Sequence, residues 1–294
     1  MRIVVTGSEG RVGRAIAAEL AREHDVVRLD RVQGASRVHY VGDVGDRALL
    51  ATAFAGAHAV AHVAALHAPH VGVVSDAEIE RVNVEATRAV ISAARAAGVR
   101  RIVFTSTTAL YGMASQTSGR ATWIDEAVEP RPLTICHRTK LAAERLLREA
   151  ADDSLQVRIL RMSRCFPEAA DVTGVYRLHR GIDARDVATA HAAALVHEGD
   201  PHHTWVISGA PPFEASDLQA LGEDAAAVLR VRAPGLAAAY DARGWLLPAS
   251  IDRVYVPARA MRELAWRPRH GFEAVLAMLD QGSAEVLAPL RVRR

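Results

Sequence analysis

Residues 3–13 read IVVTGSEGRVG, an apolar run that passes through three spaced glycines into a helical pattern. In such a loop one glycine makes the tight turn, a second lets the backbone approach a pyrophosphate, and a third lets helix and strand pack closely. The start of the following helix presents free N–H groups and the positive end of its dipole. We therefore predict a dinucleotide phosphate site made by Gly7, Gly10 and Gly13, with Arg11 and Val12 between them.

Short apolar runs alternate with amphipathic stretches through the first half of the chain. This alternation predicts an α/β fold, a Rossmann-type doubly wound parallel sheet covered by helices on both faces. We expect a dinucleotide-binding domain over 1–161, with 180–198 returning to it as a strand that runs into a helix. Residues 162–179 and 199–294 are expected to form mainly a smaller substrate-binding region. The predicted strands are 3–6, 26–29, 38–41, 59–65, 101–107 and 156–161, and the predicted helices are 11–22, 76–97 and 135–150.

Composition narrows the class of protein. The chain has 294 residues and a formal charge of +2, with acidic and basic residues interspersed, which argues against a nucleic-acid partner. Two cysteines are too few for a disulfide framework, and no apolar run reaches membrane-spanning length. The first residues open directly as a strand rather than as a signal segment. We expect a cytoplasmic protein with a small-molecule substrate, no membrane contact and no metal site.

The second predicted strand ends in Asp30, about 20 residues beyond the glycine loop, where an acid accepts hydrogen bonds from a ribose. Asp30 favours NAD, because a 2′-phosphate would meet a like charge. Arg31 follows at once and is able to pair with that phosphate. The sequence therefore predicts a nicotinamide dinucleotide, NAD or NADP, and leaves the choice between them open.

The pattern TGxxGxxG resembles that of the extended (atypical) short-chain dehydrogenase/reductase family, the relatives of nucleotide-sugar epimerases and dehydratases. Further segments are similar to that family: 42–44 (GDV), 62–65 (HVAA), 82–84 (VNV), 105–112 (TSTTALYG), 160–163 (LRMS) and 258–276. The resemblance implies a nicotinamide cofactor, and by analogy a possible homodimer. It implies further cofactor contacts at Asp43, Val44, Ala64, Ala65, Lys140 and Ser163. It also implies a catalytic hydroxyl at Thr107, with Ser106 as the alternative. The substrate contacts that it implies are Ser106, Tyr111, Cys165 and Phe166.

The resemblance fails at one place. The family pattern is Tyr-x-x-x-Lys, whereas this chain has Cys136 four residues before Lys140, the one lysine in the sequence. A cysteine sulfur is one bond from Cβ, so it falls several ångströms short of the position of a phenolic oxygen. A general acid must lie within hydrogen-bond reach of the proton it transfers. We therefore expect Cys136 to occupy the position of the catalytic tyrosine without acting as the acid.

Three functions are compatible with a sequence that has the lysine of the family pattern but not its tyrosine. The first is a reductase that uses the reduced cofactor on a ketone, with the proton supplied by water at Thr107 or by a phenol of the substrate itself. The freed space favours a bulky, flat substrate such as an aromatic polyketide of an antibiotic pathway. The second is a nucleotide-sugar epimerase or dehydratase, and the third is a non-catalytic dinucleotide sensor or scaffold.

Overall fold

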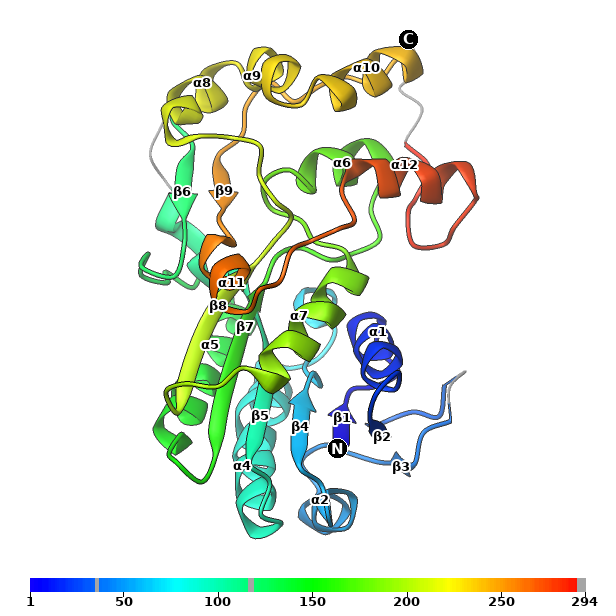
Figure 1. Ribbon diagram of the computed structural model, residues 1–294, viewed down its shortest axis with the longest axis vertical. Helices are drawn as coiled ribbons and strands as arrows, with labels where there is room; N and C mark the ends of the chain where they lie inside the picture. The colour runs from blue at the N-terminus through cyan, green and yellow to red at the C-terminus, as the bar shows by residue number, and fades with distance from the viewer. Residues whose placement is uncertain (35–36, 116–118, 290–294) are drawn as a thin grey trace.

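The structure is a computed structural model, and it describes residues 1–34, 37–115 and 119–289. At its centre lies one seven-stranded sheet in the order β3-β2-β1-β4-β5-β7-β8, with every neighbouring pair parallel (Figure 1). The strand order reverses at β1, between β2 and β4. In open α/β sheets a ligand binds outside the carboxyl ends of the strands at such a switch point. The strands are β1 (Arg2–Thr6), β2 (Asp25–Asp30), β3 (Tyr40–Val41), β4 (Ala59–His62), β5 (Arg101–Thr107), β7 (Gln156–Met162) and β8 (His202–Ile207).

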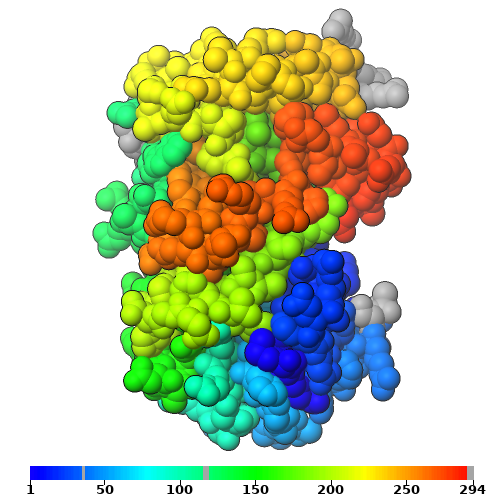
Figure 2. All heavy atoms as spheres, in the orientation of Figure 1, coloured from blue at the N-terminus to red at the C-terminus, as the bar shows by residue number. Residues whose placement is uncertain are grey.

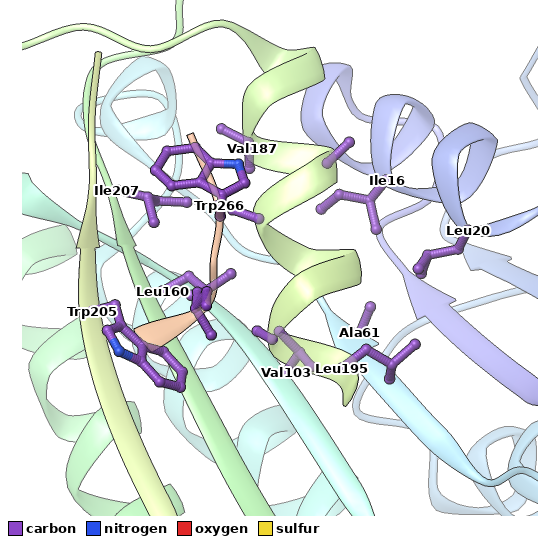
Figure 3. Packing of buried hydrophobic residues seen from close by; sticks show 14 of the residues in the cluster. Ile16, Leu20, Ala61, Val103, Leu160, Val187, Leu195, Trp205, Ile207 and Trp266 are labelled. Carbon is purple, nitrogen blue, oxygen red and sulfur yellow. The ribbon is translucent and has the colours of Figure 1, made fainter. Parts of the chain in front are cut away.

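Helices cover both faces of this sheet because successive strand residues point to opposite sides. On one face Ile3 and Val5 pack with α1 (Arg11–Leu20) and α7 (Ala184–Val196). Figure 3 shows Ile16 and Leu20 of α1 and Val187 and Leu195 of α7 packed in one cluster with Ala61, Val103 and Leu160 of the sheet. On the other face Val4 and its neighbours pack against α2 (Arg47–Phe54), α4 (Ala86–Ala96) and α5 (Ile135–Ala150).

A second group of elements gathers beyond the carboxyl ends of the strands. The short parallel strands β6 (Thr122–Ile124) and β9 (Arg253–Tyr255) share a separate apolar cluster with the helices that follow β8. Figure 2 shows residues 218–243 (yellow) at the end of the molecule opposite the N-terminal strands (blue). The helices here are α6 (Ala170–Tyr176), α8 (Leu218–Glu223), α9 (Ala225–Arg232), α10 (Pro234–Arg243), α11 (Ala258–Glu263) and α12 (Phe272–Asp280), with the 3₁₀ turn η4 (Ala215–Asp217) before α8.

The parallel α/β sheet is confirmed, and several details of the prediction are corrected. The long helix predicted over 76–97 is α3 (Asp76–Glu80), a π-helical turn η2 (Arg81–Glu85) and α4. Residues 180–183 are not a strand, because backbone bonds tie them to Arg164 and Tyr176 as a turn before α7. The seventh strand, β8, was not predicted, since its sequence HHTWVI begins with polar residues. The proposed division of the chain into two regions stays a prediction.

No helix of the described residues is long and apolar enough to cross a membrane. Two 3₁₀ segments follow strands of the sheet: η3 (Thr108–Ser115) comes directly after β5, and η1 (Ala68–His70) comes a short stretch after β4. Together with the turns after β1 and β7 they form the edge of the sheet at which the predicted site residues meet.

Candidate functional site

The glycine loop lies against the end of β4. Gly7 has φ +68°, and a Cβ on it would lie 2.7 Å from the backbone of Ala64. The Oγ1 atom of Thr6 accepts hydrogen bonds from the amides of Val63 and Ala64 at 3.2 and 3.3 Å. Gly10 then forms the N-cap of α1, and Gly13 is buried in its first turn. The loop therefore has the close backbone packing that the sequence predicts, with Arg11 and Val12 at the start of α1, where Arg11 pairs with Glu285 at 2.8 Å.

Asp30 fixes the loop from the neighbouring strand. Its carboxylate accepts hydrogen bonds from the amides of Glu9 at 2.8 Å and Val32 at 3.2 Å. Arg31 is exposed beside it, and its charge helps lower the pKa of Asp43. Both groups that weigh on the choice between NAD and NADP therefore lie at the same edge, and the choice stays open.

Asp43 follows β3 and is held by an arginine that the sequence did not single out. Arg81 donates to both carboxylate oxygens at 3.2 and 2.8 Å, and the amide of Gly45 donates as well. These hydrogen bonds, Arg81 first, hold the pKa of Asp43 below its ordinary value. Val44, by contrast, points into the core beneath α2 and α4 and presents only its backbone to the edge.

Asn83 joins the end of β4 to α5. Its amide nitrogen donates to the Leu66 carbonyl at 2.8 Å and to Thr139 Oγ1 at 3.0 Å, and its oxygen accepts from the Leu66 amide at 2.8 Å. Asn83 lies within the π-helical turn, and such turns are frequent at functional sites. This arrangement fixes the segment containing Ala64 and Ala65 relative to the helix that carries Lys140.

Lys140 is buried at the carboxyl end of β5. Its Nζ donates to the Thr105 carbonyl at 2.7 Å and lies 4.4 Å from the centroid of the Phe104 ring. Burial lowers the pKa of this ammonium to about 8. The Thr105 hydroxyl bonds His191 Nε2 at 2.8 Å on the α7 side, so the strand residue under Lys140 is fixed from both faces.

Cys136 lies one helical turn before Lys140 and is 6% exposed. It packs with Leu66, Ile79 and Val82 in a small apolar cluster. Desolvation raises the pKa of its thiol above the ordinary value. The first turn of α5 therefore contributes a neutral, buried thiol to this part of the molecule.

The two candidate hydroxyls of β5 differ in environment. Thr107 is half-buried at the end of the strand, where its Oγ1 accepts from the amide of Ala109 at 3.1 Å. Ser106 is 1% exposed and donates to Glu144 Oε1 at 2.6 Å. Thr107 lies at the edge of the sheet, and its catalytic role stays a prediction. The prediction of Ser106 as a substrate contact is corrected, because its hydroxyl faces α5 and is covered.

Tyr111 belongs to a buried polar network. Its hydroxyl accepts from Arg161 at 2.9 Å and donates to the Asp125 carbonyl at 2.9 Å, and Arg161 donates to Glu144 at 2.7 and 3.1 Å. Burial raises the pKa of Tyr111 to about 12. The residue is fully buried, so its prediction as a substrate contact is corrected: it anchors η3 to β7. Glu144 and Arg161 were missed, although Glu144 stands four residues after Lys140, one turn farther along α5.

Of the two substrate contacts predicted in the segment after β7, one is buried in the core and the other is partly exposed. Cys165 is buried in the core between α1 and α7, and burial raises the pKa of its thiol to about 11, so its prediction as a substrate contact is also wrong. Phe166 is half-buried, and its ring stacks on His67 with centroids 5.5 Å apart. Phe166 thus stays a candidate substrate contact, and His67 joins it.

Buried hydroxyls at the edge fit a bound ligand. Ser163 Oγ is 2% exposed and Ser8 Oγ is fully buried, and neither has a hydrogen-bond partner among the described residues. Buried polar groups are almost always paired in proteins, so an unpaired group marks a place for a further partner. Together with the close approach at Gly7, these hydroxyls at the ends of β1 and β7 fit a polar dinucleotide along the switch point.

The parallel sheet and the glycine loop at its carboxyl edge together define an α/β nucleotide-binding protein of the Rossmann type. Residues 3–177 match the NAD dependent epimerase/dehydratase family, and the chain belongs to that family.

Relatives with several activities share this similarity. L-arabinose 1-dehydrogenase (NAD(P)(+)) of Haloferax volcanii is 35% identical over 170 residues, which are 55% of this chain and 66% of the relative. A UDP-glucose 4-epimerase of Yersinia pestis is 28% identical over 55% of this chain and 52% of its own. The 4-hydroxy-2-methyl-3-oxo-4-farnesyl-3,4-dihydroquinoline-1-oxide ketoreductase of Stigmatella aurantiaca is 32% identical over 51% of this chain and 46% of its own. The similarity thus spans about half to two thirds of these relatives.

Solved structures match over nearly the whole chain. A short-chain dehydrogenase/reductase superfamily protein from Agrobacterium tumefaciens with bound NAD gives a TM-score of 0.69 at 22% identity, covering 97% of this chain and 96% of that chain. The UDP-glucose 4-epimerase from Bifidobacterium longum in complex with NAD⁺ and UDP gives a TM-score of 0.68 at 19% identity, covering 97% and 100%. These likenesses establish the fold, and the substrate is a separate question.

Proposed function

We propose that this protein is an NAD(P)H-dependent ketoreductase that reduces a carbonyl of a bulky, flat secondary metabolite without a protein phenol as the proton donor. The observation that carries the proposal is the pairing within α5. Lys140 is kept at the reacting edge, while Cys136, in the place expected of the family tyrosine, is a covered thiol with a raised pKa. A proton then has to come from the substrate or from water.

Different residues would bind different parts of the dinucleotide. The loop at Gly7, Gly10 and Gly13 and the start of α1 would hold the pyrophosphate, and Asp30 would accept from the adenosine ribose. Lys140 would hold the nicotinamide ribose and keep the local field positive. When bound, the reduced cofactor supplies a hydride to the carbonyl carbon.

Thr107 would hold the carbonyl oxygen or a water beside it. It lies half-buried at the end of β5, two residues after Thr105, whose carbonyl accepts from Lys140. A phenol beside the ketone of the substrate would hydrogen-bond the same oxygen and stabilise the charge that develops there. Aromatic polyketide ketones carry such a phenol, and the similarity to a quinoline-oxide ketoreductase supports this class.

An epimerase or dehydratase of nucleotide sugars is the second candidate, favoured by the similarity to UDP-glucose 4-epimerases. Those reactions need acid/base assistance at an aliphatic hydroxyl, and a sugar has no phenol to replace the missing tyrosine. A dinucleotide that stays bound through purification, with UDP-glucose converted, would favour this candidate. A non-catalytic sensor would bind the dinucleotide but would not consume it, whichever ketone is supplied.

The test uses 2-acetyl-1-naphthol, a flat ketone with an adjacent phenol, and its methyl ether. We expect the protein to oxidise NADH or NADPH with the naphthol, and Lys140→Met to lose most of that turnover. If the substrate phenol supplies the proton, the ether reacts about a hundredfold or more slowly, the usual contribution of a general acid. Equal rates for the two ketones would assign the proton to water. No oxidation of either coenzyme with either ketone would contradict the proposal.

A further inference from the structure

Aromatic rings and guanidinium groups alternate along one line at the edge of the sheet. The line starts at His67 after β4, passes through Phe166 and Arg164 after β7, and reaches Tyr176 at the end of α6 and Arg180 before α7. We call this set the stacked ladder. Its members come from segments far apart in the sequence, and α6 lies beyond the carboxyl ends of the strands in Figure 1.

The stacked ladder combines one ring–ring stack with guanidinium groups lying over ring faces. The rings of His67 and Phe166 lie 5.5 Å apart with an angle of 28° between their planes. The guanidinium carbon of Arg164 lies 5.1 Å from the Phe166 centroid and 6.0 Å from that of Tyr176. The guanidinium carbon of Arg180 lies 5.1 Å from the same Tyr176 ring. Arginine stacks readily on aromatic faces, so each member holds the next in place.

The charges of the stacked ladder are balanced by acids on its flank. Arg164 forms a two-armed pair with Glu168 at 2.6 and 2.7 Å, and Arg180 lies 3.4 Å from Asp252. A guanidinium already paired in this way has less capacity to bind a diphosphate. The ladder therefore offers a π-face rather than a site for a polyanion.

His67 is an exposed end of the stacked ladder, and it follows Leu66, which packs with Cys136 one helical turn before Lys140. Desolvation, the neighbouring His70 and the charge of Lys140 together lower the pKa of His67, so its ring is neutral at pH 7. The neutral imidazole is stacked on Phe166, and the ring of His70 lies nearly perpendicular to it at 5.0 Å.

We propose that the stacked ladder is the specificity platform for the substrate, with a flat aromatic ring of the ketone stacking on His67 while Phe166 and Arg164 hold that imidazole in place. This inference rests on the proposed ketoreductase function and names its substrate class: aromatic ketones rather than nucleotide sugars. Aromatic stacking adds free energy beyond area burial, and only a flat ring gains it.

The first test measures binding, apart from turnover. With saturating NAD⁺ present, the dissociation constant of 2-acetyl-1-naphthol is measured by its fluorescence, beside that of cyclohexyl methyl ketone by competition. We expect His67→Ala to weaken naphthol binding about tenfold, the loss of one good stacking contact. His67→Phe should retain the binding, and Phe166→Leu, which keeps apolar volume but removes the ring, should weaken it about threefold.

The two ketones separate a stacking role from a structural one. Cyclohexyl methyl ketone has no π-face, so its affinity should stay the same in all three variants. Equal losses for both ketones, or tight naphthol binding in His67→Ala, would overturn the platform. Wild-type protein that binds UDP-glucose more tightly than the naphthol, or does not bind the naphthol, would overturn it as well.

Failure of the platform is distinguishable from failure of the proposed reaction. If the naphthol binds as described but no coenzyme is oxidised, the platform stands and the ketoreductase proposal fails. If the naphthol is reduced and His67→Ala retains the wild-type kcat/KM for it, the reaction stands and the platform fails.

Discussion

The glycine loop and helix α5 meet the same edge of the sheet, but they are built in different ways. The loop is made by backbone: Gly7 packs on Ala64, Gly10 caps α1, and Asp30 binds an amide of the loop. Helix α5 is fixed by side chains. Lys140 bonds Thr105, Glu144 bonds Ser106 and Arg161, and Cys136 sits in an apolar cluster.

This difference explains which parts of the site are free to change. A backbone loop depends on glycine wherever a Cβ would collide with the chain, as it would at Gly7 and Gly13. A side-chain contact can be exchanged one residue at a time while the helix stays in place. The first turn of α5 therefore holds a cysteine while Lys140, one turn later, keeps its contact with β5.

The largest expected effect is on α5 itself, at Glu144. This carboxylate is fully buried and binds Arg161, Arg148 and Ser106. Glu144→Gln removes the charge and leaves Arg161 buried without compensation, which should cost roughly 3–5 kcal/mol of unfolding free energy. Denaturant unfolding measures this loss.

Glu149→Gln is the matched control, because Glu149 lies exposed on the same helix. It should change the unfolding free energy by less than about 0.5 kcal/mol. Equal effects of the two substitutions would show that the buried network does not fix α5.

A smaller loss is expected at the glycine loop. In Gly7→Ala the new Cβ would lie 2.7 Å from the backbone of Ala64, and the residue has φ +68°. We expect the affinity for NAD⁺ to fall about a hundredfold, which corresponds to about 2.7 kcal/mol. Calorimetric titration measures it.

Gly98→Ala is the control that separates the effect of backbone strain at a positive φ from the effect of a steric clash. Gly98 also has φ +68°, but a Cβ there meets nothing within 4 Å. The substitution should cost about 1 kcal/mol of stability and leave NAD⁺ affinity unchanged. Unchanged affinity in Gly7→Ala as well would contradict the assignment of the loop.

A weaker, pH-dependent effect is expected from the buried histidines. Burial lowers the pKa of His191 to about 4, so the folded protein keeps this ring neutral while the unfolded chain takes up a proton below about pH 6.5. Stability is therefore fully present above pH 6.5 and is lost as the pH falls toward 4. Between pH 7 and 5.5 the loss should be about 1 kcal/mol for this group.

The comparison is between His191→Gln and His202→Gln. His202→Gln is the matched control, because His202 lies exposed at the start of β8. The His191 variant should show a shallower fall in unfolding free energy between pH 6.5 and 4. A slope equal to that of the wild type would mean that His191 is protonated in the folded state.

The sequence predicted the glycine loop, Asp30 and the parallel sheet because these depend on local spacing and on strand-by-strand apolar runs. It did not predict the Arg81–Asp43 pair or the Glu144–Arg161–Tyr111 network, because their members lie far apart in the chain. Ser106, Tyr111 and Cys165 were predicted as substrate contacts from neighbouring motif positions. Only packing shows that their side chains point into the protein, while Thr107 and Phe166 remain at the edge.

The central claim is that the thiol at the start of α5 does not move the proton. It is tested most directly by the turnover of Cys136→Ala with 2-acetyl-1-naphthol and reduced coenzyme. We predict that kcat stays within about twofold of the wild type, because a covered, neutral thiol is not a general acid. A fall of a hundredfold or more, with coenzyme affinity retained, would make Cys136 the acid and contradict the account.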